Sequence, residues 1–280
     1  MIEKYYDGAI EQVAAGLGTV EKNYLLVRYS GQFSVENLND TKQLEKNEDI
    51  FVQVHEFETG EITCAYEPYL TMICDGFRRY MTGTFEEFME TCDVYYLHRP
   101  VLLGYFNQDN TGREEIILLD EVAYEQERML AALERMLCAI ADRHPVLFVL
   151  NRFQLASKST MQLTARFLKC ENCNIGLVLG VSDIQAMPEF LVPDWEMLYE
   201  TLDDGSKIYH IGNSGRKKEE TIDDEKYVDY GSEKVYRKLQ NMVEFLDFDQ
   251  AAYYLETIER KIKFDNLLVD DAARFRMWLL

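Results

Sequence analysis

Two groups of residues have the types that bind metal ions, but neither has the arrangement that a metal site needs. Cys170 and Cys173 have the spacing of zinc ligands, yet a structural zinc site needs four ligands and no second pair follows. The acidic runs Asp203-Asp204 and Asp223-Asp224-Glu225 lack the alternating spacing of a calcium loop. We interpret the cysteines as the end of a helix and the acidic runs as solvated surface. The sequence predicts no metal site.

The histidines and serines form no local catalytic motif. The four histidines are far apart in the sequence, and no Gly-x-Ser-x-Gly turn is present. A Ser/His/Asp or Cys/His group could therefore assemble only through the fold.

Two strand-like apolar runs are each followed by polar residues. The run Tyr24–Val27 leads into a segment that ends at Glu36, and the run Val146–Leu150 leads into Asn151 and Arg152.

These positions depend on a regular alternation of helices and strands. Apolar residues at helical spacing predict helices over 8–22, 68–80, 85–91, 121–143, 157–169 and 195–202. Short apolar runs predict strands over 24–29, 50–55, 146–150 and 175–179, with an edge strand at 207–211 and loop at 92–112. Helices alternating with fully apolar strands are typical of a parallel sheet covered on both faces. We therefore expect an α/β fold of three layers.

The C-terminal part has a different character. Residues 213–233 are charged and contain glycine, which favours a linker, and 234–280 read as helices with a break at Leu246 to Asp249. The segment 248–256 resembles half of a tetratricopeptide repeat, although such arrays need about three repeats for stability. We expect a helical hairpin that begins a repeat array, and the apolar end at 278–280 suggests that the array continues in a longer parent protein.

The stretch from Asp120 to Gly180 resembles the Walker B to sensor 1 region of the ATPase domains of STAND-type signalling proteins, which are related to the AAA+ class. The likeness lies in a helix that ends before Pro145, an apolar strand, the short stretch Phe153 through Ser157, and a second apolar strand. Tyr66-Glu67-Pro68-Tyr69 also resembles the family, and the whole likeness covers roughly 5–180. It implies a P-loop NTPase-like domain over 1–212, in a large bacterial regulator with tetratricopeptide-like helices behind it.

Departures from the family pattern bear on activity. A P-loop needs a lysine for the β/γ-phosphates and a hydroxyl for Mg²⁺, and Val35 and Glu36 stand at those positions. The family has two acidic residues where Asn151 and Arg152 stand here. The amide cannot supply a magnesium-holding carboxylate, and the arginine adds positive charge where catalysis needs negative charge. The resemblance therefore implies a pseudo-ATPase. It also implies where a nucleotide would bind, if one still does: at Ser30, Gly31, Gln32, Ser34 and Asn151, through backbone N–H groups of the loop and the Asn151 amide.

Composition restricts the partners and the compartment. The 29 Lys+Arg against 50 Asp+Glu give a formal net charge of −21, which repels nucleic acid and anionic membranes. No apolar run has the roughly 20 residues of a membrane span, and no secretory signal is visible. The six cysteines are scattered through a large domain, which favours reduced thiols and a cytoplasmic protein.

We therefore expect a non-enzymatic regulatory or interaction module that partners a protein or further domains of its own chain, as a monomer or dimer. Two alternatives stay open. One is a nucleotide-gated switch that binds ATP or GTP with little hydrolysis, whereas the leading hypothesis expects no cofactor, with ATP possible. The other is an adaptor that binds partners through its C-terminal helices.

Overall fold

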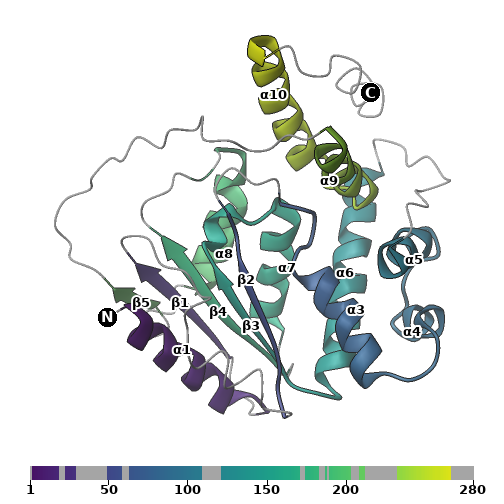
Figure 1. Cartoon of the computed structure of the whole chain (residues 1–280). Coiled ribbons are helices and arrows are strands. Elements are labelled where there is room, and N and C mark those ends of the chain that lie inside the picture. The colour runs from purple at the N-terminus through teal and green to yellow at the C-terminus, as the bar shows by residue number, and fades with distance from the viewer. Residues whose placement is uncertain are drawn as a thin grey trace.

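Five parallel strands form the centre of the fold (Figure 1). The computed structural model describes residues 2–18, 23–29, 49–58, 63–108, 121–170, 174–182, 187, 189–202, 208–211 and 232–265. The strands are β1 (Tyr24–Tyr29), β2 (Phe51–Glu56), β3 (Val146–Asn151), β4 (Ile175–Ser182) and β5 (Ile208–Ile211). Their order in the sheet is β2-β3-β4-β1-β5, and every neighbouring pair is parallel. The predicted α/β fold with a parallel sheet is confirmed, and β5 is an edge strand as expected.

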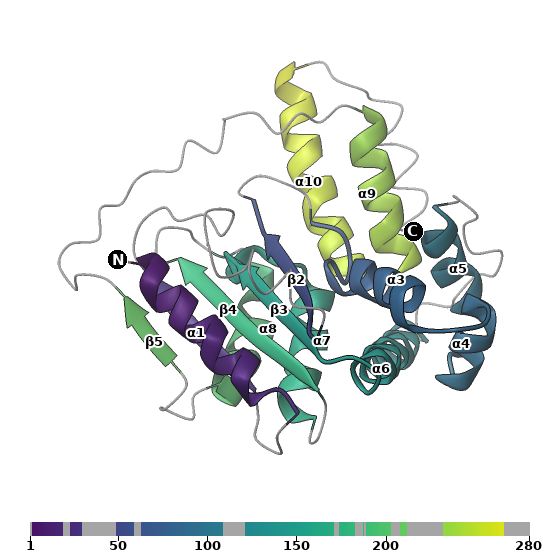
Figure 2. The same cartoon turned by 60° about the horizontal axis from the view of Figure 1, so that its bottom comes forward.

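Both faces of the sheet are covered, which is why β3 and β4 are buried along their whole length. On β3, Phe148 packs in the larger core, and its neighbour Leu147 packs on the opposite face under α1 (Ile2–Gly16). A Cβ on Gly176 of β4 would lie 2.7 Å from a methyl of Val13, so this glycine lets α1 lie close to the sheet. Figure 2 shows α1 on one face of the sheet and α7 and α8 behind the other.

Most predicted helices are present. The structure has α3 (Tyr69–Tyr80), α4 (Phe85–Thr91), α6 (Val122–Ala141), α7 (Lys158–Lys169) and α8 (Val192–Leu202), each close to its predicted range. Two short 3₁₀ turns, η2 (Phe153–Leu155) and η3 (Glu189–Leu191), precede α7 and α8. None of the described helices is both long and apolar enough to cross a membrane.

Two predictions of local structure are wrong. The first helix was expected over 8–22, but α1 starts at Ile2 and ends at Gly16, where the Asn23 side-chain amide donates to the Gly16 carbonyl at 2.7 Å. That bond satisfies one of the carbonyls left unpaired at a helix end. Residues 92–112 were expected to be loop, but they contain α5 (Arg99–Asn107). Pro100 lies in the first turn of α5, where its missing N–H has no intrahelical partner to lose.

The C-terminal hairpin consists of α9 (Ser232–Glu244) and α10 (Phe248–Asp265), with the break at the predicted place. Leu246 takes a left-handed conformation (φ 66°) in the connecting turn. The hairpin lies beside α3 and α5 in both views (Figures 1 and 2). Phe245 at its turn is buried against the rings of Tyr66 and Tyr105.

Candidate functional site

The carboxyl ends of four strands bring polar side chains to one edge of the sheet. Tyr29 ends β1, Glu56 ends β2, Asn151 ends β3 and Ser182 ends β4. After β1 the chain crosses the sheet to β2 at one edge, and after β4 it crosses in the opposite direction to β5 at the other edge. Ligands of open α/β sheets bind at such a switch point, outside the carboxyl ends of the strands. This edge is therefore the candidate site.

Tyr29 and Asn151 form the centre of the edge. The Tyr29 hydroxyl donates to Asn151 Oδ1 at 2.6 Å, and the two residues are 1% and 0% exposed. Because β4 lies between β1 and β3, this hydrogen bond spans the middle strand. Burial raises the pKa of Tyr29 to about 12, against the opposing effects of the Arg152 charge and the Asn151 bond. The phenol is therefore neutral at physiological pH and acts as the donor.

Arg152 is paired within the same edge. Its guanidinium lies 3.1 Å from Glu56 Oε1, and the two side chains are 25% and 16% exposed. The Arg152 backbone has a left-handed conformation (φ 53°), which turns the chain from β3 into η2. Such a conformation is unfavourable for a residue with a Cβ, so the surrounding contacts must hold it. The positive charge that replaces an expected acid is thus balanced by a neighbouring carboxylate.

Gln154 ties η2 to the end of β4. Its amide nitrogen donates to the Ser182 carbonyl at 3.1 Å, and its amide oxygen accepts from the Ser182 N–H at 3.4 Å. Both residues are buried. This double contact fixes the turn that follows Asn151 and joins the ends of β3 and β4 into one unit.

The segment after η2 connects this edge to the C-terminal hairpin. Ser157 caps α7, its hydroxyl accepting from the Thr160 N–H at 3.2 Å. Asp247, in the turn between α9 and α10, accepts from the Ser159 N–H of the same helix end at 3.2 Å. Lys158 adds an ion pair with Asp249. The hairpin therefore binds directly to the first turn of α7.

Asp247 is almost fully buried in this contact. Burial raises its pKa above the ordinary aspartate value, while the bonds from Ser159 and the Lys158 charge act in the other direction. A carboxylate beside the N–H groups of a helix start is also favoured by the helix dipole. The contact of Asp247 with the start of α7 thus holds the hairpin closely against the core.

The structure places only part of the predicted site. Asn151 lies at the edge as expected, whereas Ser30, Gly31, Gln32 and Ser34 lie outside the described residues, as does Cys173. No group of three potential metal ligands occurs in the part of the chain that the structure describes. Tyr29, Glu56 and Gln154 were not predicted as site residues. Their signal in the sequence is their position, since each lies at or just beyond the end of a strand.

Replacing Tyr29 with phenylalanine is expected to lower the free energy of unfolding by about 1–2 kcal/mol, because a buried Asn151 oxygen loses its 2.6 Å donor. Urea unfolding measures the change. Tyr24→Phe is a matched control on the same strand, since the Tyr24 hydroxyl donates to the Thr201 carbonyl at the longer distance of 3.4 Å. Equal losses in the two variants would show that the Tyr29–Asn151 hydrogen bond adds no more to the free energy of unfolding than the weaker Tyr24 contact does.

Comparison with known proteins adds no relationship. The sequence matches no protein-family model, and no curated protein is significantly similar to it. The chemistry of the edge must therefore be judged from its own residues. It offers a neutral amide, a neutral phenol and an arginine paired with a glutamate.

Proposed function

We propose that this chain is a non-enzymatic regulatory or interaction module, a degenerate ATPase-type core whose state is passed to its C-terminal helices. One observation carries the proposal. The polar side chains at the carboxyl edge bond each other, Tyr29 to Asn151 and Glu56 to Arg152. Among the described residues of the edge, these paired groups offer little to a metal–nucleotide complex.

The arrangement of the sheet supports the ATPase-type ancestry. Read from the other side, the strand order is β5-β1-β4-β3-β2, which is the order expected for a core of the AAA+ class. Asn151 then stands at the end of β3, where such a core needs an acidic residue. The resemblance to STAND-type ATPase domains and to tetratricopeptide repeats belongs to this proposal.

The chemistry of the edge argues against phosphoryl transfer. That reaction depends on positioned Mg²⁺ and on groups that stabilise charge on the transferred phosphoryl. Asn151 has no charge with which to hold Mg²⁺, and the carboxylate of Glu56 is engaged by Arg152. Magnesium would have to displace a partly buried ion pair before it could bind there. We therefore assign the core no hydrolytic role.

The short path from Asn151 to the helix end that contacts the hairpin supports a signalling role for the hairpin. Asn151 is followed by η2, and η2 leads into the α7 turn that Asp247 and Gln250 contact. Gln250 accepts from the Lys158 N–H at 3.3 Å and is buried. A displacement of the edge would therefore reach the hairpin within one short segment. The partner that we propose for that hairpin is another protein or a further domain of the same chain.

The test is calorimetric titration of ATP with magnesium into the purified chain, repeated with ADP and GTP. We expect no heat and no thermal stabilisation at millimolar nucleotide. ATP turnover that is abolished by Asn151→Ala would overturn the proposal. Micromolar binding without turnover would instead establish the nucleotide-gated switch.

A further inference from the structure

A short stretch of the hairpin, residues 241–250, holds it against the core. At one end of this stretch, the Asn241 side-chain carbonyl accepts from the Ala65 N–H at 3.0 Å. At the other end, the Gln250 side-chain carbonyl accepts from the Lys158 N–H at 3.3 Å. The residues between these ends that also contact the core are Phe245, Leu246, Asp247 and Asp249. One continuous segment thus carries contacts that a linear segment of another protein could reproduce.

The core meets this stretch with a docking surface built from four segments: the β2–α3 connection, α5, α6 and the start of α7. Tyr66 of the connection and Tyr105 of α5 place their rings against Phe245, with centroids 6.1 and 5.9 Å away. The Gln126 amide of α6 donates to the Leu246 carbonyl. Each of the four segments is packed in the main core through residues of its own. The docking surface therefore belongs to the core and would outlast the departure of the hairpin.

The start of α7 requires acceptor groups at fixed places in whatever binds there. The N–H groups of Lys158 and Ser159 have no intrahelical partner, and Gln250 and Asp247 accept from them at 3.3 and 3.2 Å. The Lys158 ammonium pairs with Asp249, and the helix dipole adds to the positive potential. A ligand of the docking surface therefore needs acceptors two and five positions after its aromatic residue, and a carboxylate four positions after it.

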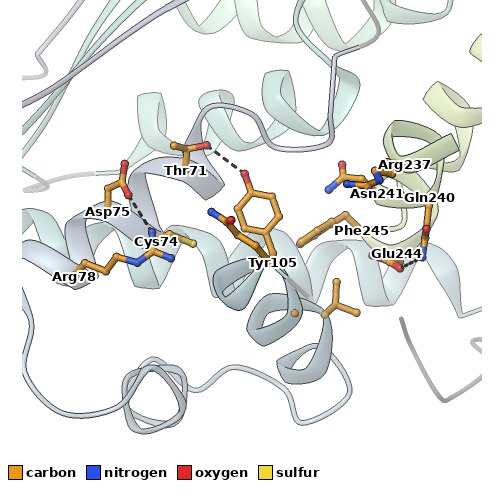
Figure 3. A pocket seen from close by; sticks show the side chains of 13 residues that line it. Thr71, Cys74, Asp75, Arg78, Tyr105, Arg237, Gln240, Asn241, Glu244 and Phe245 are labelled. Atoms are coloured by element: carbon orange, nitrogen blue, oxygen red, sulfur yellow. Dashed lines mark hydrogen bonds and ion pairs between the residues drawn. The ribbon is translucent and has the colours of Figure 1, made fainter. Parts of the chain in front are cut away.

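Beside the docking surface, α9 does not fill the space between itself and the core. A cavity of about 560 Å³ lies there, with walls from α3, α5 and α9. Figure 3 shows the labelled α3 side chains on one side of Tyr105 and those of α9 on the other. Atoms that line such a space lack dispersion contacts on one side. The hairpin is thus anchored by its turn and packs less well along α9, so a partner that fills the space could gain contacts that the hairpin lacks.

We propose that the docking surface binds a segment of a partner protein that has an aromatic residue followed by acidic residues two and four positions later, and that the hairpin is its resident occupant. The inference rests on the proposed function, because displacement of the hairpin would be the event that the partner causes. The chain has a net charge of −21, so long-range attraction cannot bring an acidic partner to it. Recognition would come from the short-range contacts around Phe245 and Asp247.

The hairpin hides the docking surface in the unchanged chain. A tethered ligand acts at an effective concentration on the order of millimolar, so a partner has to compete with it. The apparent affinity of the partner is reduced by the fraction of chains whose docking surface is open. Phe245→Ala removes the hairpin's ring from the pocket of Tyr66 and Tyr105, and so raises that fraction.

The experiment uses a labelled synthetic peptide of residues 236–256 as the probe and the full chain as the receptor, with binding followed by fluorescence anisotropy. We expect the peptide to bind the Phe245→Ala chain at least about tenfold more tightly than the unchanged chain. Asp247→Ala is a second receptor that removes a polar contact and leaves the aromatic pocket filled, and it should also bind the peptide more tightly than the unchanged chain. A peptide with alanine in place of Phe245 should bind at least about tenfold more weakly.

Two further changes in the Phe245→Ala chain test the start of α7. Lys158→Gln should weaken peptide binding about two- to fivefold, as expected for a partly exposed ion pair. Lys169→Gln is the matched control, since it removes one exposed positive charge from the other end of the same helix. It should leave peptide binding unchanged.

No binding to either receptor at millimolar peptide, or binding that survives the loss of Phe245 from the peptide, would overturn the inference. Hydrogen exchange of α9 in the Phe245→Ala chain separates this failure from that of the proposed function. If α9 is released and the peptide does not bind, the inference fails alone. If α9 is not released separately from the sheet, the hairpin cannot be displaced, and both fail.

Discussion

Replacing Tyr69 with alanine is expected to lower the free energy of unfolding by about 3–5 kcal/mol. Tyr69 begins α3 and is 0% exposed. Its ring packs edge-on against Phe148 of β3, with centroids 4.8 Å apart, and against Phe167 of α7, with centroids 5.3 Å apart. Truncation would leave a cavity where α3 and α7 pack together on the same face of β3. Chemical denaturation followed by circular dichroism measures the loss.

Tyr69→Phe separates the ring from the hydroxyl. The Tyr69 hydroxyl is 2.6 Å from Thr164 Oγ1, and Thr164 in turn donates to the Thr160 carbonyl at 2.8 Å. Thr164 keeps that second bond in the variant, so we expect a loss of only about 1 kcal/mol. A Tyr69→Phe loss as large as that of Tyr69→Ala would mean that the hydroxyl network, and not the packed ring, anchors α3.

The strands and long helices could be predicted because their signals are local. The β3 run Val146–Leu150 is continuously apolar, and both faces of that strand are indeed buried. Ser157 marks the start of α7 through capping chemistry that involves only its next few neighbours. By contrast, α5 has nine residues, and its apolar positions run almost continuously from Val101 to Phe106, so they show no helical period.

The site could be predicted only in part because its contacts join distant segments. Tyr29 and Asn151 are 122 positions apart, and no sequence feature near Tyr29 indicates that its hydroxyl bonds to Asn151. A general rule could have found it: in a parallel sheet the last residues of the strands meet at one edge, so Tyr29, Glu56 and Asn151 are neighbours by topology. Applying that rule requires the strand order, which the sequence does not supply.

The docking of the hairpin could not be predicted from the sequence for the same reason: its contacts join residues that are far apart along the chain. Residues 213–233 suggested a linker and hence a separate helical unit, and that division into 1–212 and 234–280 stays a prediction. Asp247 contacts α7 88 positions away, and Asn241 contacts the Ala65 N–H 176 positions away. These polar contacts show close docking, but they do not say whether the core and hairpin unfold together.

Replacing Phe245 with alanine addresses that question and is expected to cost about 3–5 kcal/mol of docking free energy. Phe245 is 1% exposed at the hairpin turn, with its ring 6.1 Å from Tyr66 and 5.9 Å from Tyr105. From the hairpin, the Phe245 ring therefore packs against Tyr66 of the β2–α3 connection and against Tyr105 of α5. We expect hydrogen exchange of α9 and α10 to accelerate at least about 100-fold, since each 1.4 kcal/mol is a factor of ten. The amides of β3 and β4 should keep their protection.

Phe245→Leu is the matched control, because a buried aliphatic chain of similar size should cost less than about 1.5 kcal/mol. It should therefore accelerate the exchange of α9 by no more than about tenfold. If Phe245→Ala instead accelerates exchange in β3 and α9 equally, the hairpin and the sheet form one cooperative unit. The hairpin could not then undock on its own, and a signal could not be passed by its release from the core. Selective exchange in the hairpin would show that the turn around Phe245 and Asp247 acts as the latch between the two parts.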